Sequence, residues 1–135
     1  MNVIDRRQAL AIVPLFRLGF RPFFLLGSVL AMLAIALWIM ALNGWFAQWQ
    51  PTGGWLAWHR HELLFGFAGA IIAGFLLTAV QAWTGVPGLS GKPLMALAVL
   101  WLAARVAWLV GAPLWCVLLV DVLFLPLVAA QMARS

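Results

Sequence analysis

The chain has 135 residues, of which 67% are hydrophobic and only 8% are charged, and its mean hydropathy is +1.09. Soluble domains carry roughly a quarter charged residues, so this composition excludes an ordinary soluble domain and indicates a membrane protein whose main partner is the lipid bilayer. The formal net charge of +5 does not indicate nucleic-acid binding, because the cations are spread over predicted helix ends and form no basic face.

Residues 1–22 come before the first apolar run and contain four arginines. Arg17 and Arg21 stand one helical turn apart, with phenylalanines around them. Arginines in this position hold anionic lipid headgroups while aromatic rings enter the boundary of the acyl chains. We therefore expect 1–22 to be a cytoplasmic interfacial segment.

Four apolar runs follow, each close to the roughly 18–20 residues that cross the hydrocarbon of a bilayer. The first is too long for the apolar region of a signal peptide, so we expect a retained helix. Gly, Pro and Asn residues separate the runs, and short connections make successive helices antiparallel. The sequence predicts an all-α fold, with residues 23–135 forming one antiparallel four-helix transmembrane domain. Its helices are predicted at 23–42, 62–83, 93–110 and 114–132.

Positive residues indicate which way the predicted helices cross. If the four helices alternate, one side of the membrane receives Arg6, Arg7, Arg17, Arg21, Lys92 and Arg134. Arg60 falls on the other side. Cytoplasmic loops carry the excess of Lys and Arg, so both termini are expected in the cytoplasm, in a multi-pass membrane protein. The outer, periplasmic interface is then expected to carry an aromatic belt of Trp45, Trp49, Trp55, Trp58 and Trp115.

The stretch W-H-R-H-E at 58–62 opens the second predicted helix at this outer side. Small residues recur every fourth position from Glu62, which predicts a close contact with other helices along Gly66, Ala70, Gly74, Thr78 and Ala82. His59 and Glu62 are expected on that inward side, with His61 opposite. Two interpretations stay open. The imidazoles either form hydrogen bonds at the interface, or hold a metal or haem iron with Glu62 orienting a ring.

Cys116 and Met40 are predicted at a similar depth, in the outer third of the bundle. A set of His, Cys and Met suits reduced copper, whereas one or two histidines suit haem iron. Both residues are also ordinary apolar fillers. The single cysteine has no partner for an internal disulfide.

Arg105 and Asp121 stand at nearly equal distances along the chain from the turn at 111–113. In an antiparallel hairpin their depths differ by only about 3 Å, so we expect an ion pair inside the bundle. This pair is interpreted as a lock between the third and fourth helices, as part of a proton or ligand pathway, or as an arginine offered to an anion such as a haem propionate. Trp101 and Trp108 share the side of Arg105 and are expected to shield it.

Several stretches together resemble the N-terminal region of the NnrS family, over roughly residues 15–105. They are L-F-R-L-G-F-R-P-F-F-L-L-G, W-H-R-H-E-L-L-F-G-F, A-G-F-L-L-T-A-V-Q-A-W-T-G, L-S-G-K-P-L and L-W-L-A-A-R. The positions that match the family are Arg17, Arg21, His59, His61, Glu62, Thr78, Trp83 and Arg105. The resemblance implies a bacterial inner-membrane protein that contains haem and copper and is linked to nitric oxide metabolism and resistance to nitrosative stress.

This resemblance favours a cofactor site at the periplasmic mouth of the bundle, with nitric oxide or an iron-nitrosyl species as ligand. Predicted cofactor-binding residues are His59, His61, Glu62 and Arg105. Predicted metal ligands are His59, His61, Cys116 and Met40.

Members of the family are commonly several times longer, with more than four helices. The chain is therefore expected to be a fragment, a truncated product, or a short form that assembles as a homo-oligomer through its small-residue stripe. A non-catalytic subunit or scaffold of a larger membrane assembly is the alternative function. A small transporter ranks last, because the paired broken helices of such carriers are missing from the sequence. Ser28 and Ser90 have no histidine at a matching depth, so no hydrolytic set is predicted.

Overall fold

The computed structural model describes residues 10–134, and these fold entirely into helices and connecting turns. The elements in chain order are η1 (Pro14–Phe16), α2 (Phe20–Leu42), α3 (Trp55–His61), η2 (Glu62–Ala68), α4 (Gly69–Thr84), α5 (Lys92–Leu109) and α6 (Leu114–Ala133). Because α3, η2 and α4 follow one another without a break, they form one helix of 30 residues. The described part of the chain thus contains four helices long and apolar enough to cross a membrane, which confirms the predicted fold class.

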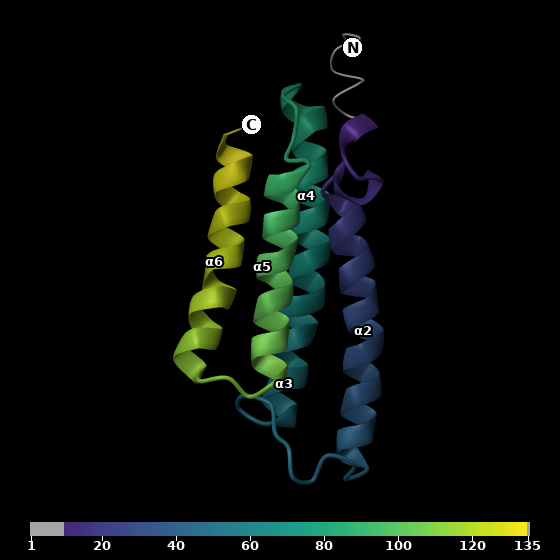
Figure 1. The fold of residues 1–135 in the computed structure, drawn as a ribbon, viewed down its shortest axis with the longest axis vertical. Coiled ribbons are helices and arrows are strands. Elements are labelled where there is room, and N and C mark those ends of the chain that lie inside the picture. The colour runs from purple at the N-terminus through teal and green to yellow at the C-terminus, as the bar shows by residue number, and fades with distance from the viewer. Residues whose placement is uncertain (1–9, 135) are drawn as a thin grey trace.

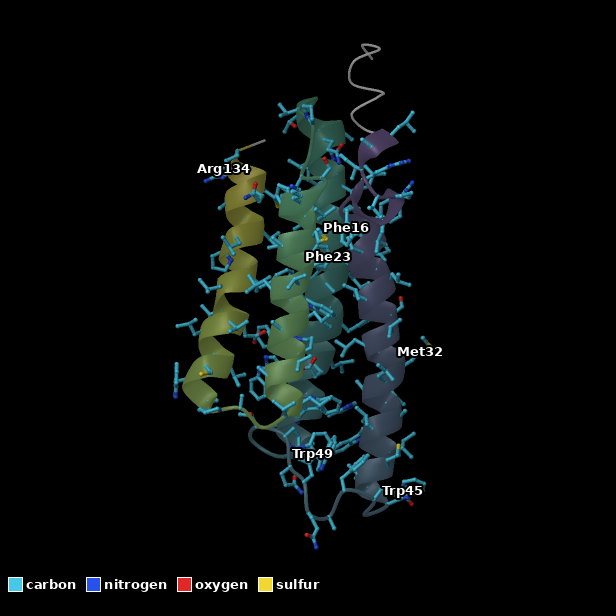
Figure 2. The ribbon with its side chains drawn as sticks, viewed as in Figure 1. Phe16, Phe23, Met32, Trp45, Trp49 and Arg134 are labelled. Atoms are coloured by element: carbon cyan, nitrogen blue, oxygen red, sulfur yellow. The ribbon has the colours of Figure 1, made fainter. Side chains whose placement is uncertain are left out.

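The four long helices stand side by side, and each runs opposite to its predecessor (Figure 1). In this view α5 lies between α2 and α6, in front of α4, and the start of α2 and the end of α6 lie at the same end of the bundle. Met32 points away from the other helices (Figure 2) and is 66% exposed. Many large apolar side chains along the helices are exposed in the same way, as expected for a surface that faces lipid.

The second long helix begins at Trp55, so the prediction that it begins at residue 62 was wrong. Gly53 and Gly54 have φ values of +75° and +85°, which glycine adopts without strain, and they end the preceding loop. The backbone N–H of Trp58 then donates to the Gly54 carbonyl at 3.0 Å. The W-H-R-H-E stretch is therefore helical throughout, with Trp58 and Glu62 buried and Arg60 exposed.

The start of α2 packs closely against α4 along the predicted small-residue stripe. A methyl group added at Gly74 would lie 2.9 Å from Cβ of Phe23 and 3.2 Å from Cα of Phe20, so only glycine fits there. Thr78 Oγ1 accepts a hydrogen bond from the backbone N–H of Phe20 at 2.9 Å. The stripe ends at Thr78, since Ala82 is exposed.

The two described arginines of the N-terminal segment bind its backbone. Arg17 donates to the carbonyls of Leu10 and Ile12, and Arg21 donates to the carbonyl of Pro14. These contacts fold residues 10–16 back over the start of α2. Arg6 and Arg7, which also entered the topology prediction, lie outside the described residues.

The aromatic residues at the opposite end divide into two groups. Trp45 and Trp115 are 72% and 71% exposed. Trp55 and Trp58 are buried and pack with Phe46 and Trp49 in a cluster of rings, so these two face other side chains and not the lipid. Their depth at the membrane interface stays a prediction. They are buried because α3 extends the second helix by seven residues into this end of the bundle. Figure 2 shows Trp45 and Trp49 at this end, far from Arg134.

Candidate functional site

Four ionisable side chains meet between the second long helix, α5 and α6, and we call them the charge cluster: His61, Glu62, Arg105 and Asp121. Arg105 donates to Asp121 through Nη2. Its Nε lies 3.6 Å from Oε2 of Glu62. His61 joins the two carboxylates, with Nε2 at 2.6 Å from Oδ2 of Asp121 and Nδ1 at 3.2 Å from Oε1 of Glu62.

The charge cluster is largely buried, so its stability depends on these contacts. Glu62 is 1% exposed and Arg105 is 5% exposed. Charges removed from water in this way are stable only when they are paired, and removing one partner is far more damaging than removing both. The predicted pairing of Arg105 with Asp121 across the hairpin is confirmed, and the cluster ties three of the four long helices together.

A π-helical turn, η2, carries Glu62 into the cluster, and such turns occur frequently at functional sites. Trp101 of α5 donates through Nε1 to the carbonyl of Gly66 at 3.2 Å, which anchors this turn. A methyl group at Gly66 would lie 2.7 Å from Oε2 of Glu62 and 3.1 Å from Nη1 of Arg105. Glycine at this position therefore makes the room that the carboxylate and guanidinium occupy.

His61 points into the charge cluster, so the prediction that it projects away from Glu62 was wrong. That prediction assumed one buried face along the stripe toward α2, whereas this end of the helix is also covered by α5 and α6. The ring lies between Trp108 and Phe65, with centroids at 4.0 Å and 5.1 Å. Trp108 thus covers His61, while Trp101 lies 5.7 Å from the Arg105 guanidinium, as predicted.

His59 lies outside the charge cluster and turns toward α2. Its ring stacks on Trp38, with centroids 4.8 Å apart and planes 11° from parallel. Nδ1 of this ring is buried and has no hydrogen-bond partner within residues 10–134. The two histidines therefore belong to different parts of the bundle, as their spacing predicts for a regular helix.

The predicted ligands Met40 and Cys116 are both half-buried, near the end of α2 and in the first turn of α6. Neither takes part in the contacts of the charge cluster. Over the part of the chain that the structure describes, no three His, Cys, Asp or Glu side chains are grouped so that they could hold a metal ion. The structure brings together His61, Glu62 and Arg105 of the predicted site, and it leaves His59, Cys116 and Met40 apart from them.

Two features of the site were not predicted from the sequence. The sequence predicted that Asp121 pairs with Arg105, but not that it contacts His61. The depth of Asp121 in the bundle, opposite the start of the second helix, could have indicated this contact. Trp58 and Trp108 each bury an indole N–H without a hydrogen-bond partner among the described residues. The sequence around these two tryptophans gives no signal for that.

Comparison with known proteins agrees with the resemblance found in the sequence. The family model described as NnrS protein matches residues 14–135. No curated protein and no solved structure matches the chain. The match covers nearly the whole sequence, including the charge cluster, His59 and all four long helices. The chain belongs to the NnrS family.

Proposed function

We propose that the chain is an NnrS-like integral membrane protein that binds haem or copper through His59 at the α3 end of the bundle, on the periplasmic side. We further propose that it acts in nitric oxide metabolism or in resistance to nitrosative stress. The observation that carries the ligand assignment is the buried Nδ1 of His59, which has no hydrogen-bond partner in the described part of the chain.

The described residues fit a metal site with one imidazole ligand better than a site with two. A buried ring nitrogen without a partner is costly, and coordination to a metal would satisfy it. Trp38 fixes the plane of the His59 ring by stacking. His61 has both ring nitrogens within hydrogen-bond distance of carboxylates, so it would have to give up one of them to bind a metal.

The chain's own residues would hold and orient the cofactor. A haem iron or copper ion supplies an open coordination position for a small ligand such as nitric oxide. His59 would bind the metal, and the charge cluster would keep its helix in register with α5 and α6. Arg105 already pairs with two carboxylates, so we do not assign it to bind a haem propionate. Further ligands would come from Met40, Cys116, another copy, or later helices of a longer chain.

The first test is the absorption spectrum and metal content of the detergent-purified chain, produced in cells supplied with copper and a haem precursor. We expect His59→Ala to lose most of the bound cofactor and His61→Ala to keep it. Circular dichroism and gel filtration would check that both variants remain folded. Equal retention by both variants, or colourless and metal-free wild type, would contradict the proposal.

A further inference from the structure

A cavity of about 300 Å³ lies among the end of α4, the α4–α5 loop and the end of α6. Ser90 of the loop and Arg134 after α6 are among its lining residues, and the lining exposes both polar and apolar atoms. A second cavity, of about 370 Å³, lies between α5 and α6 and has an almost wholly aliphatic lining. The two cavities share Leu89, Pro93 and Gln131, so they adjoin and form one groove, which we call the α5–α6 groove.

The α5–α6 groove runs from one end of the bundle toward its middle. Arg134 lies at that end, after the last turn of α6 (Figure 2). The aliphatic part of the groove extends along α5 from Pro93 to Leu100, which is about 10 Å at the rise of a helix. Pro93, Ala96 and Leu127 are exposed on membrane-length helices, so the groove is open toward lipid. It therefore matches an amphiphile that lies parallel to the helices, with its polar head at Arg134.

The charge at this end of the bundle favours an anionic head. The described cations here are Arg17, Arg21, Lys92 and Arg134. Within residues 10–134 the only acidic side chains are Glu62 and Asp121, and both pair inside the charge cluster. Asp121 precedes Arg134 by about 20 Å along α6. Arg134 thus has no acidic partner in the described part of the chain.

The same charges disfavour other occupants of the groove. A second copy of the chain would have to bring a carboxylate to Arg134, but both acids of its residues 10–134 are held in its own charge cluster. A soluble phosphate would leave the aliphatic part of the groove without contacts. A zwitterionic lipid would bring its own cation close to Arg134. An anionic phospholipid fits both parts, and basic pockets between membrane helices are places where anionic headgroups bind.

We propose that the α5–α6 groove binds one anionic phospholipid. Its phosphate lies at Arg134 and Ser90, and one acyl chain follows α5 from Pro93 toward Leu100. The guanidinium donates charge-assisted hydrogen bonds to the phosphate oxygens, and the hydroxyl of Ser90 is a further donor. This site lies at the opposite end of the bundle from His59 and does not depend on haem or copper.

Native mass spectrometry of the delipidated, detergent-purified chain would test the proposal. Two lipids with the same acyl chains are titrated: palmitoyl-oleoyl phosphatidylglycerol, which is anionic, and palmitoyl-oleoyl phosphatidylcholine, which is zwitterionic. We expect one saturable site for phosphatidylglycerol and about fivefold weaker binding of phosphatidylcholine, since one arginine near the membrane surface contributes about that factor. Glycerophosphoglycerol, the same headgroup without acyl chains, should not compete.

Variants at exposed positions locate the two parts of the lipid. Arg134→Gln removes the charge and should lower the affinity for phosphatidylglycerol about fivefold, to that for phosphatidylcholine. Arg60→Gln, at the opposite end of the bundle, is its matched control. Ala96→Trp fills the aliphatic part and should weaken the binding of both lipids, whereas Ala103→Trp, on the same helix outside the groove, should bind as wild type does. His59→Ala should also bind as wild type does, which separates this proposal from that of the metal ligand.

Four results would each overturn the proposal. Equal affinity of the wild type for the two lipids would mean an ordinary lipid belt around the helices. An undiminished preference for phosphatidylglycerol in Arg134→Gln would place the headgroup at another cation. Competition by glycerophosphoglycerol would mean a site for soluble phosphate esters. A dimer that Ala96→Trp dissociates would mean that a second copy occupies the groove.

Discussion

Arg105 is the residue on which the charge cluster depends, because it faces both buried carboxylates. A lone guanidinium at this depth would be unfavourable, and so would two carboxylates without it. His61 also links the two carboxylates, through the oxygens that Arg105 does not contact, Oε1 of Glu62 and Oδ2 of Asp121. Each member of the cluster is thus stable in its buried position because of the charges of the others.

Arg105→Met should lower the free energy of unfolding by about 3–5 kcal/mol, because it leaves two buried carboxylates without their cation. Thermal unfolding in detergent, followed by circular dichroism, would measure this. The double variant Arg105→Met with Asp121→Asn should recover part of the loss, since it removes one of the uncompensated charges. Equal stability of the single variant and wild type would show that the cluster does not hold the helices together.

The sequence predicted some of these contacts and missed others for physical reasons. The depth of Arg105 and Asp121 follows from the constant rise of a helix, so counting from the turn was sufficient. The direction of His61 depends on which neighbours cover each face of the helix, and one sequence does not contain that information. The π-helical turn at Glu62–Ala68 has no clear sequence signal either.

The second long helix is the element that joins the parts of the molecule, since α2 packs along α4 and the charge cluster joins η2 to α5 and α6. Its start was mispredicted because the W-H-R-H stretch is less apolar than a typical membrane segment. Gly53 and Gly54 were the better signal for the start of this helix. Glycine readily adopts positive φ values, and with such values these two residues end the loop immediately before Trp55. Its packing stripe, in contrast, was visible as small residues at every fourth position.

Gly74→Ala should destabilise the chain by about 1–3 kcal/mol, because the new methyl group would press on Cβ of Phe23 and on the backbone of Phe20. Gly69→Ala is the matched control in the same helix, since its added methyl group would meet nothing closer than 3.7 Å. It should be neutral or slightly stabilising, as alanine favours helix more than glycine does. Thermal unfolding of both variants would compare them, and similar losses would contradict close packing at Gly74.

The bundle carries Phe16 and Arg134 toward one end and Trp49, from the cluster of aromatic rings, at the other (Figure 2). The number of long helices and their antiparallel order followed from hydropathy and loop length. The orientation of the bundle in the membrane rests on the distribution of Lys and Arg alone. It therefore stays a prediction that the aromatic end faces the periplasm.

Cysteine labelling would test that orientation. In a Cys116→Ser background, Trp115→Cys should react with a membrane-impermeant maleimide added to spheroplasts, because Trp115 is 71% exposed at the aromatic end. Arg134→Cys should react only after the membrane is opened. The reverse pattern would place His59 on the cytoplasmic side and contradict the proposed topology.

The start of α2 and the end of α6 lie at one end of the bundle, which has a consequence for engineering (Figure 1). Two copies joined tail to head by a short hydrophilic tether would insert with the same orientation, since neither needs to be inverted. Such a concatemer would fix the ratio of subunits and allow a substitution to be introduced into one repeat alone. A mixed dimer of this kind would reveal whether each copy holds its own cofactor or shares one with its neighbour.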